Sequence, residues 1–370
     1  MYFLLGVHSL LRFLPHPLPP RLRLTGGPCV DTRLSAYLAA RLGRATVEFA
    51  EPPALVPDGW EAYIYRFRPR PVAGLPRRFD RPLVLRLYAG PHGLARARRE
   101  FSAQCHVFRH GYPVPEPLLL EEDSDLLGGP FLVMEQVPGP TLLDRLRTNW
   151  TRILAVPAQL ARLHARLHAL PPDGLANGDG PFLGRQLDEL RRTTRTYDLD
   201  GLTAGLRWLN DHRPPDPDSP CLLHLDFHPV NLIARADGEG AVLDWSEADV
   251  GDRHADLAMT TLMLRCAPVE GLAAHERLVA PLTRWLLARR YRVVYRRRAP
   301  FDRERLRYYF AWACLRRLAT YGMWLRAGPL TNGSKPGALG RVTPRLVREL
   351  AGWFERASGI GVDLSVRAKR

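Results

Sequence analysis

Hydrophobic residues in the first part of the chain recur at helical spacing and then gather in short runs. Leucines repeat every four residues after the cap-like pair Asp31-Thr32, which predicts a helix over 31–42. The segments 63–67 and 83–87 are rich in aromatic and apolar side chains, as β-strands are. A Pro- and Arg-rich linker over 69–82 separates them. This order predicts a helix followed by a sheet.

Helical spacing dominates the later part of the chain. Before it, the pattern predicts a helix over 95–110 and an apolar strand over 131–135. Further helices are predicted at 160–170 (with an apolar leucine face), 186–212, 256–265, 272–290, 302–326 and 343–356. A chain of 370 residues, 46% of them hydrophobic, suits two lobes. We expect one lobe over 31–134 and a larger one over 135–370, after an extension over 1–30.

Polar residues suited to chemistry are concentrated in the segment 224–244, HLDFHPVNLIARADGEGAVLD. Two short apolar stretches, 232–234 and 241–243, flank the turn-forming pair Asp237-Gly238, which predicts a β-hairpin. Asn231 precedes the first strand and Asp244 follows the second. The hairpin is therefore expected to bring these two residues together although they are far apart in sequence.

The spacing His224-x-Asp226-x-x-x-x-Asn231 is that of a kinase catalytic loop. In that loop the aspartate accepts the proton of the acceptor hydroxyl, so Asp226 is the candidate base. Amide and carboxylate oxygens suit Mg²⁺, which makes Asn231 and Asp244 the candidate metal ligands. His224 completes the catalytic set, and we interpret it as a scaffold of the loop rather than as a proton carrier.

The residues after this motif also follow a pattern typical of small-molecule kinases. Asp244 is followed by Trp245, and then by Gly251-Asp252 and Asp256-Leu257-Ala258. In these residues the chain resembles the aminoglycoside phosphotransferase and choline kinase-like family. The resemblance implies an α+β, two-lobed protein-kinase-like fold. Its small N-terminal lobe would hold an antiparallel sheet and a helix, and its larger, mainly helical C-terminal lobe would carry the catalytic hairpin.

The resemblance further implies a site for ATP between the lobes. Arg86 stands where the family has a phosphate-contacting lysine; arginine keeps the charge but differs in geometry, and an ordinary strand-end charge is the alternative. Glu100 is expected either to pair with Arg86 or to be a surface charge. Backbone groups at Glu135 and Val137 are expected to bind adenine. Gly59 is the only glycine where a phosphate-covering loop would lie, which is fewer than usual.

Two histidine patterns allow a different interpretation. His224, Asp226 and His228 together could bind a transition metal, but Asn231 and Asp244 would then have no role and Pro229 interrupts the strand. A second pair, His164 and His168, is four residues apart on a predicted helix but lacks the glutamate of a zinc-protease helix. We interpret that pair as part of a helix face.

The charge of the chain raises a nucleic-acid hypothesis that the distribution of charge weakens. The 53 basic residues exceed the 38 acidic ones by 15, giving a net charge of +15. Nearly all are scattered arginines, because lysine occurs only at Lys335 and Lys369. The densest run, within 289–298, is typical of a solvated helix end or loop. A nucleic-acid partner is therefore not expected.

Cysteine usage and the first residues bear on the compartment. The five cysteines are scattered and form no Cys-x-x-Cys pair, which favours a reducing environment. Residues 1–20 have neither the uninterrupted apolar length of a membrane span nor the basic start of a signal peptide. We expect a cytoplasmic protein without a membrane partner.

These features predict an ATP- and magnesium-dependent phosphotransferase that acts on a hydroxyl of a small molecule. The departures at Arg86 and in the glycine-poor loop leave a nucleotide-binding pseudokinase with a regulatory role as the alternative. Arginines outnumber acidic residues over 302–326, which favours a neutral or anionic acceptor alcohol. Three aromatic residues on that helix could line an acceptor pocket, although such residues more often belong to the core: Trp312, Tyr321 and Trp324.

Overall fold

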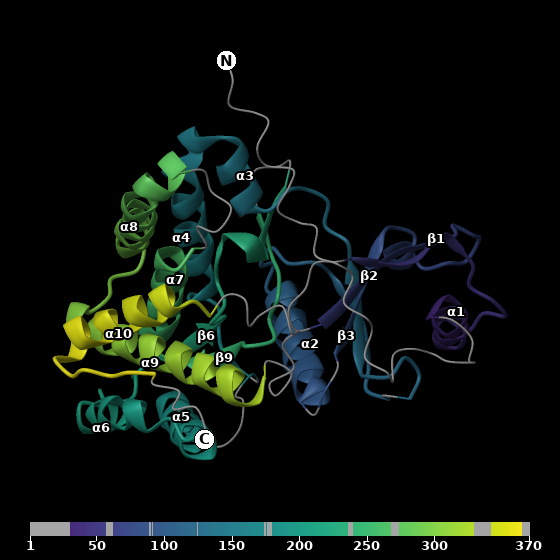
Figure 1. The fold of residues 1–370 in the computed structure, drawn as a ribbon. Helices are drawn as coiled ribbons and strands as arrows, with labels where there is room; N and C mark the ends of the chain where they lie inside the picture. The colour runs from purple at the N-terminus through teal and green to yellow at the C-terminus, as the bar shows by residue number, and fades with distance from the viewer. Residues whose placement is uncertain are drawn as a thin grey trace.

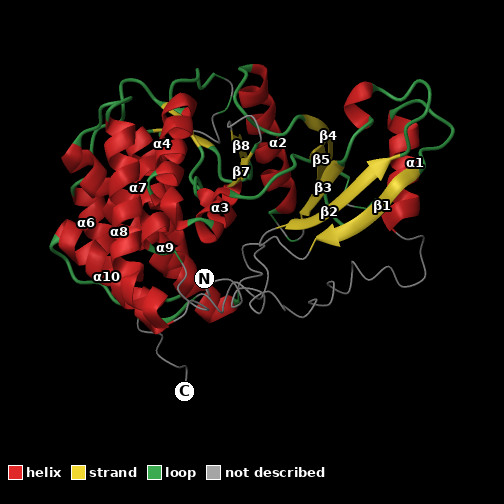
Figure 2. Cartoon of the chain, turned by 90° about the horizontal axis from the view of Figure 1, so that it is seen from above, coloured by secondary structure: helices red, strands yellow, loops and turns green. Residues whose placement is uncertain are grey.

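The computed structural model describes residues 30–56, 62–88, 90, 92–123, 125–173, 175, 180–235, 240–267, 274–328 and 342–364. A small lobe built on a sheet lies beside a larger, mainly helical lobe (Figure 1). Seen from above, the strands β1–β5 and helix α1 lie on one side and the helices α3, α4 and α6–α10 on the other, with α2 between them (Figure 2). The predicted α+β organisation is therefore present.

The N-terminal lobe is a five-stranded antiparallel sheet in the order β1-β2-β3-β5-β4. Its elements are α1 (Val30–Arg41), β1 (Phe49–Val56), β2 (Ala62–Pro69), β3 (Leu83–Tyr88), α2 (Gly93–Arg109), β4 (Pro117–Glu121) and β5 (Phe131–Glu135). Alternate residues of β5 point to opposite faces of the sheet. Val133 belongs to a core cluster with Leu34 of α1, whereas Leu132 packs with Ala97 of α2. A short 3₁₀ turn, η1 (Arg77–Phe79), lies in the linker before β3.

Strand β1 has no counterpart among the predicted strands. Its sequence contains Pro52 and Pro53, and most of its side chains are exposed or half-buried. Proline cannot donate to a ladder hydrogen bond and is tolerated mainly on edge strands, where β1 lies. Gly59 and the rest of the β1–β2 loop lie outside the described residues.

The C-terminal lobe is mainly helical and carries two small β-ladders. Its first elements are α3 (Leu142–Thr148), η2 (Trp150–Ile153), α4 (Ala155–Leu167), α5 (Phe182–Thr196), η3 (Asp200–Leu202) and α6 (Thr203–Asp211). They are followed by β6 (Cys221–Leu223), η4 (Pro229–Asn231), β7 (Leu232–Ala234), β8 (Gly240–Val242) and β9 (Asp249–Gly251). The last helices are α7 (Arg253–Arg265), α8 (Ala274–Arg296), α9 (Arg303–Ala327) and α10 (Pro344–Ser358).

The predicted hairpin forms, with β7 antiparallel to β8. Its turn pair Asp237-Gly238 lies outside the described residues. The amide of Leu243 donates to the carbonyl of Asn231 (2.8 Å), so the two ends of the hairpin are held together. A second antiparallel pair, β6 and β9, was not among the predicted elements and delivers the chain to the His-x-Asp motif.

Two helix predictions need correction. The stretch 186–212 is not one helix, because α5 ends at Thr196 and Asp198 takes a left-handed φ of 51° before α6. The helix predicted to end at residue 290 continues to Arg296. Tyr291 and Tyr295 lie one turn apart on its buried face, so tertiary packing extends the helix through the arginine run.

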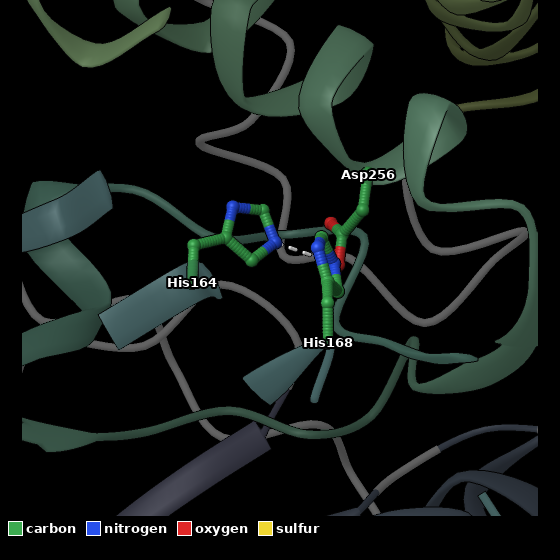
Figure 3. A group of neighbouring side chains, drawn as sticks. All are labelled: His164, His168 and Asp256. Carbon is green, nitrogen blue, oxygen red and sulfur yellow. Dashed lines mark hydrogen bonds and ion pairs between the residues drawn. The ribbon is translucent and has the colours of Figure 1, made fainter. Parts of the chain in front are cut away.

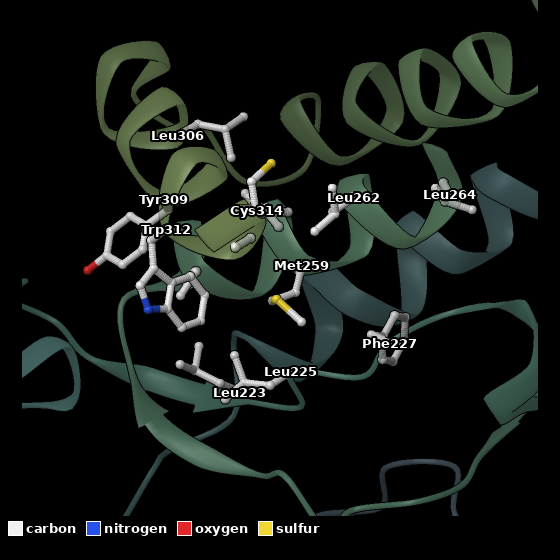
Figure 4. Close-up of a cluster of buried hydrophobic side chains, with 14 of the residues drawn as sticks. Leu223, Leu225, Phe227, Met259, Leu262, Leu264, Leu306, Tyr309, Trp312 and Cys314 are labelled. Atoms are coloured by element: carbon white, nitrogen blue, oxygen red, sulfur yellow. The ribbon is translucent and has the colours of Figure 1, made fainter. Parts of the chain in front are cut away.

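The apolar residues of the motif pack into a buried cluster (Figure 4). Leu223, Leu225 and Phe227 alternate with the polar residues of the motif and are buried together with Met259 of α7. On α9, the three aromatic candidates for an acceptor pocket are at most 9% exposed and belong to this core: Trp312, Tyr321 and Trp324. The packing fixes the backbone from which His224 and Asp226 project.

Candidate active site

The backbone after β6 is held by the carboxylate of Asp256. His224 N donates to Asp256 Oδ2 (2.6 Å) and Leu225 N donates to Asp256 Oδ1 (2.8 Å). Leu225 has a φ of 61°, a left-handed conformation that is strained for a residue with a Cβ. Asp256, at the start of α7, thus stabilises an unfavourable turn that directs Asp226 away from the core.

The ring of His224 connects the loop to the hairpin. Its Nε2 lies 3.0 Å from the carbonyl of Leu243, and its Nδ1 accepts a bond from Asp226 N (3.3 Å). Burial lowers the pKa of His224, so its ring is neutral near pH 7. These contacts support the interpretation of His224 as a scaffold.

Asp226 and Asn231 face each other. Asn231 Nδ2 donates to Asp226 Oδ2 (2.8 Å) and to the carbonyl of Asp226 (3.0 Å), which leaves Asn231 Oδ1 as the free acceptor of the amide. Burial raises the pKa of Asp226, but His228 and His224 lower it by more, so the carboxyl is ionised at neutral pH. The side chain of Asp226 is 33% exposed and is accessible from solvent.

Asp244 lies where β8 meets the N-terminal lobe. Its φ is 64°, and Ser246 Oγ donates to its Oδ1 (2.8 Å). Arg86 Nη2 of β3 lies 3.2 Å from the same oxygen. Asp244 thereby joins the two lobes, and its side chain remains 27% exposed.

Arg86 also pairs with Glu100 of α2, at 2.6 Å between Nη1 and Oε1. Both side chains are buried, and the Tyr88 hydroxyl donates to the second oxygen of Glu100. Of the two alternatives for Glu100, the ion pair with Arg86 therefore forms and a surface charge does not. A contact of Arg86 with nucleotide phosphates stays a prediction. The guanidinium fork bridges both carboxylates, which a single ammonium group would do with less fixed geometry.

We predict a pH effect on stability from Glu100. Burial, opposed by Arg86, raises its pKa from 4.5 to about 7. Between these values the folded protein retains a proton that the unfolded chain has lost, so this group's stabilising contribution falls as pH rises. Glu100→Gln mimics the protonated form. As the pH rises from 4.5 to about 7, its free energy of unfolding should therefore increase by roughly 3 kcal/mol relative to that of the wild type.

The quantity to measure is the difference in free energy of unfolding between Glu100→Gln and the wild type, because a second buried group changes stability with pH in the opposite direction. Burial lowers the pKa of His168 from 6.5 to about 4, so its contribution is lost as pH falls. Urea unfolding of both proteins is measured at several pH values from 4.5 to 8. The contribution of His168 is the same in both proteins and cancels in the difference. A difference that does not change with pH would contradict the raised pKa of Glu100.

Glu135 and Val137 lie where β5 leads into the helical lobe. Glu135 N donates to the carbonyl of Glu116 (3.0 Å), and the Glu135 carboxylate lies near Arg81 and Arg235, at 3.5 and 3.7 Å. The N–H of Val137 bonds to no described residue, which leaves it available as a donor. The role of this segment in binding adenine stays a prediction.

The transition-metal hypothesis for His224, Asp226 and His228 does not fit this geometry. Both ring nitrogens of His224 are engaged by the loop and the hairpin, as described above. His228 Nδ1 accepts from Val230 N (3.2 Å), and only its Nε2 approaches Asp226, at 3.5 Å from Oδ2. The three side chains do not converge on one point.

His164 lies on the buried face of α4 and His168 is its C-cap residue. The two form a network that the sequence patterns did not reveal. Their Nε2 atoms lie 2.9 and 3.2 Å from Asp256 Oδ2 (Figure 3). Their Nδ1 atoms contact the hydroxyls of Tyr291 (2.6 Å) and Tyr295 (2.7 Å). Each tyrosine can donate to a neutral imidazole, and His168 Nε2 in turn bonds to the carboxylate. His164 Nε2 lies close to the same oxygen but meets no hydrogen-bond geometry there.

The residues at the hairpin fit a magnesium ion by their chemistry. Asn231 Oδ1 and the Asp244 carboxylate are oxygen donors at the two ends of one hairpin, and the amide of Asn231 contacts Asp226. Mg²⁺ prefers such oxygens and keeps waters and substrate phosphates in its remaining positions. The donor set is therefore sufficient without further protein ligands.

Comparison with known proteins shows the family to which the chain belongs. A model of the phosphotransferase enzyme family matches residues 53–318. The match spans the sheet, the hairpin and most of α9, and the chain belongs to this family. The family is one of phosphotransferases, which agrees with the kinase-type spacing of His224, Asp226 and Asn231.

Solved structures share the fold. A Ralstonia eutropha protein assigned to the aminoglycoside phosphotransferases superimposes with a TM-score of 0.58 at 18% identity, covering 89% of this chain and 98% of that one. A thermostable mutant of aminoglycoside phosphotransferase APH(4)-Ia, in complex with ADP and hygromycin B, gives 0.54 at 21% identity, covering 85% and 98%. The two-lobed protein-kinase-like fold is thereby confirmed.

A curated relative is closer in sequence but much longer. Acyl-CoA dehydrogenase family member 11 of Gallus gallus is 32% identical over 187 residues, which are 46% of this chain and 24% of that protein. The match thus spans about a quarter of the relative's length. Among the described residues, no helix is both long and apolar enough to cross a bilayer.

Proposed function

We propose that the protein transfers the γ-phosphoryl group of ATP to a hydroxyl of a small molecule in a magnesium-dependent reaction. The observation that carries this proposal is one hairpin that holds Asn231 and Asp244 at its two ends. Asn231 bonds to Asp226, and Asp244 pairs with Arg86 of the other lobe. Membership of the phosphotransferase family and a solved relative bound to ADP support it.

The chain's own residues divide the work of this reaction. Asp226 orients the acceptor hydroxyl and receives its proton, while Asn231 fixes the Asp226 carboxylate through its amide nitrogen. A magnesium ion held by Asn231 and Asp244 would neutralise charge on the transferred group. Arg86, which pairs with Glu100 and Asp244, would contact the nucleotide phosphates. The backbone at Glu135 and Val137 would hold adenine.

The first acceptors to test follow from the curated relative. Its name refers to acyl-CoA dehydrogenases, whose substrates are thioesters of coenzyme A. We propose hydroxyacyl-CoA thioesters and their free hydroxy acids as acceptors, since both present an alcohol on an anionic molecule. We also propose a cytoplasmic location, supported by free thiols at Cys105, Cys221, Cys266 and Cys314.

The test is ADP release with an acceptor panel, followed over a magnesium titration, with nucleotide binding measured separately by thermal shift. Turnover that requires both magnesium and an acceptor supports the proposal. Nucleotide binding without turnover on any acceptor would instead support the pseudokinase alternative, which the replacement of the family's lysine by Arg86 favours.

A further inference from the structure

A cavity of about 480 Å³ lies between α4, the first residue of β8 and the segment that follows α8. This volume is within the range of roughly 300–1,000 Å³ that is typical of small-molecule sites. None of the described residues that line the cavity belongs to the candidate active site. Its lining includes Arg162, Leu163, Ala165, Arg166, Gly240 and Arg298.

The cavity is positively charged. It is lined by three exposed arginines, and no carboxylate is among the described residues that line it. The side chains of Arg162 and Arg298 form no hydrogen bond or ion pair with any residue that the structure describes. A concave site lined by charge of one sign concentrates ions of the opposite sign. These charges therefore favour an anionic ligand.

Arg298 also changes the interpretation of the arginine run within 289–298. The sequence pattern assigned that run to a solvated helix end or loop. Helix α8 ends at Arg296, and Arg298 lies just beyond it, where it lines the cavity together with Arg162 and Arg166 of α4. At least one arginine of the run thus takes part in a concave site that a second helix completes.

Contacts around the cavity hold part of its lining in place. Arg166 Nη2 donates to the carbonyl of Gly111 (2.5 Å), and its guanidinium carbon lies 5.8 Å from the centre of the Tyr112 ring. The Tyr112 hydroxyl in turn donates to the carbonyl of Leu163 (3.0 Å). A Cβ at Gly240 would lie 3.2 Å from Leu163 Cδ1, so β8 packs closely on α4 at this point. Groups that are already positioned lose less conformational entropy when a ligand binds.

We propose that this cavity binds a small molecule that carries a phosphate group, at a site separate from the candidate active site. A carboxylate has two oxygens in one plane, and a single guanidinium can satisfy both. The peripheral oxygens of a phosphate point in several directions and can accept from guanidinium groups on two different elements. Leu163 and Ala165 offer apolar surface to the organic part of the ligand.

The test compares Arg162→Gln and Arg298→Gln with the matched control Arg297→Gln. Arg297 is the exposed neighbour of Arg298 in the same run but is not part of the cavity lining. Calorimetric titrations without magnesium use inorganic pyrophosphate and glycerol 3-phosphate as probes. Each cavity variant should weaken binding by roughly 10-fold or more, the effect of losing one charged hydrogen bond, and Arg297→Gln should leave it unchanged. All variants should unfold at the temperature of the wild type, since the three side chains are exposed.

Ala165→Phe separates a shaped site from general attraction to a basic chain. It keeps every charge but fills part of the cavity, so it should also weaken binding. Affinity that is unchanged in Ala165→Phe, or that falls as much in Arg297→Gln as in the cavity variants, would overturn the site, as would the absence of measurable binding to the wild type. An RNA oligonucleotide, or vesicles containing phosphatidic acid, might compete as sources of phosphate. Tighter binding of either one than of the small probes, lost in the same cavity variants, would overturn the small-molecule class.

Discussion

Asp226→Asn is expected to reduce turnover by about 10²- to 10⁴-fold while nucleotide binding stays intact, the range typical for loss of a positioned proton acceptor. The substitution keeps the size of the side chain and a partner for Asn231. It removes the negative charge that His228 and His224 stabilise. Because the lowered pKa makes Asp226 a weak base, we attribute its effect mainly to orienting the hydroxyl and accepting the proton late in transfer.

The matched control is Asp216→Asn, at a side chain that is 48% exposed and, within the described part of the chain, pairs only with Arg213. Both variants should unfold at the temperature of the wild type, since Asp226 is partly exposed and forms no contact that fixes a core element. Single-turnover measurements of phosphoryl transfer and thermal shifts with ATP check the two expectations. Residual turnover close to the wild-type rate in Asp226→Asn would refute the catalytic assignment.

The site could be predicted from the sequence where its geometry is local. His224, Asp226 and Asn231 lie within eight positions, and a strand–turn–strand pattern is enough to bring Asp244 back to Asn231. The pairing of Arg86 with Glu100 was one of two alternatives that the sequence left open, and the burial of Glu100 against the strand decides between them. The ion pair between Arg86 and Asp244 depends on how the two lobes pack against each other, and no local sequence pattern specifies that packing.

The parts that could not be predicted depend on long-range contacts. Asp256 attracted attention only as part of a motif, yet it fixes the backbone of His224 and joins α4, α7 and the loop in one network. His164 and His168 looked like a helix face because their partners, Tyr291 and Tyr295, lie far along the chain. Those tyrosines also extend α8 beyond its predicted end. In each case tertiary packing decides the structure over local propensity.

Asp256→Asn is expected to lower stability as well as turnover. Asp226→Asn, in contrast, should lower turnover alone. The Asp256 carboxylate is fully buried, accepts from the amides of His224 and Leu225 and from the His168 imidazole, and lies 2.9 Å from His164 Nε2. An amide group in its place has only one acceptor oxygen and turns an N–H toward the remaining donors. Breaking a buried charged network of this kind costs about 3–5 kcal/mol.

Asp256→Asn should therefore lower both the free energy of unfolding and turnover, because the strained turn at Leu225 loses its support. Urea unfolding and single-turnover kinetics on the same preparations measure the two quantities. His168→Gln, which removes one imidazole but keeps a donor to Asp256, should give a smaller loss of stability and leave most of the turnover. If Asp256→Asn were as stable as the wild type, the network would not be what holds His224 and Asp226 in place. The position of the catalytic loop would then have to be set by the packing of Leu223, Leu225 and Phe227 alone.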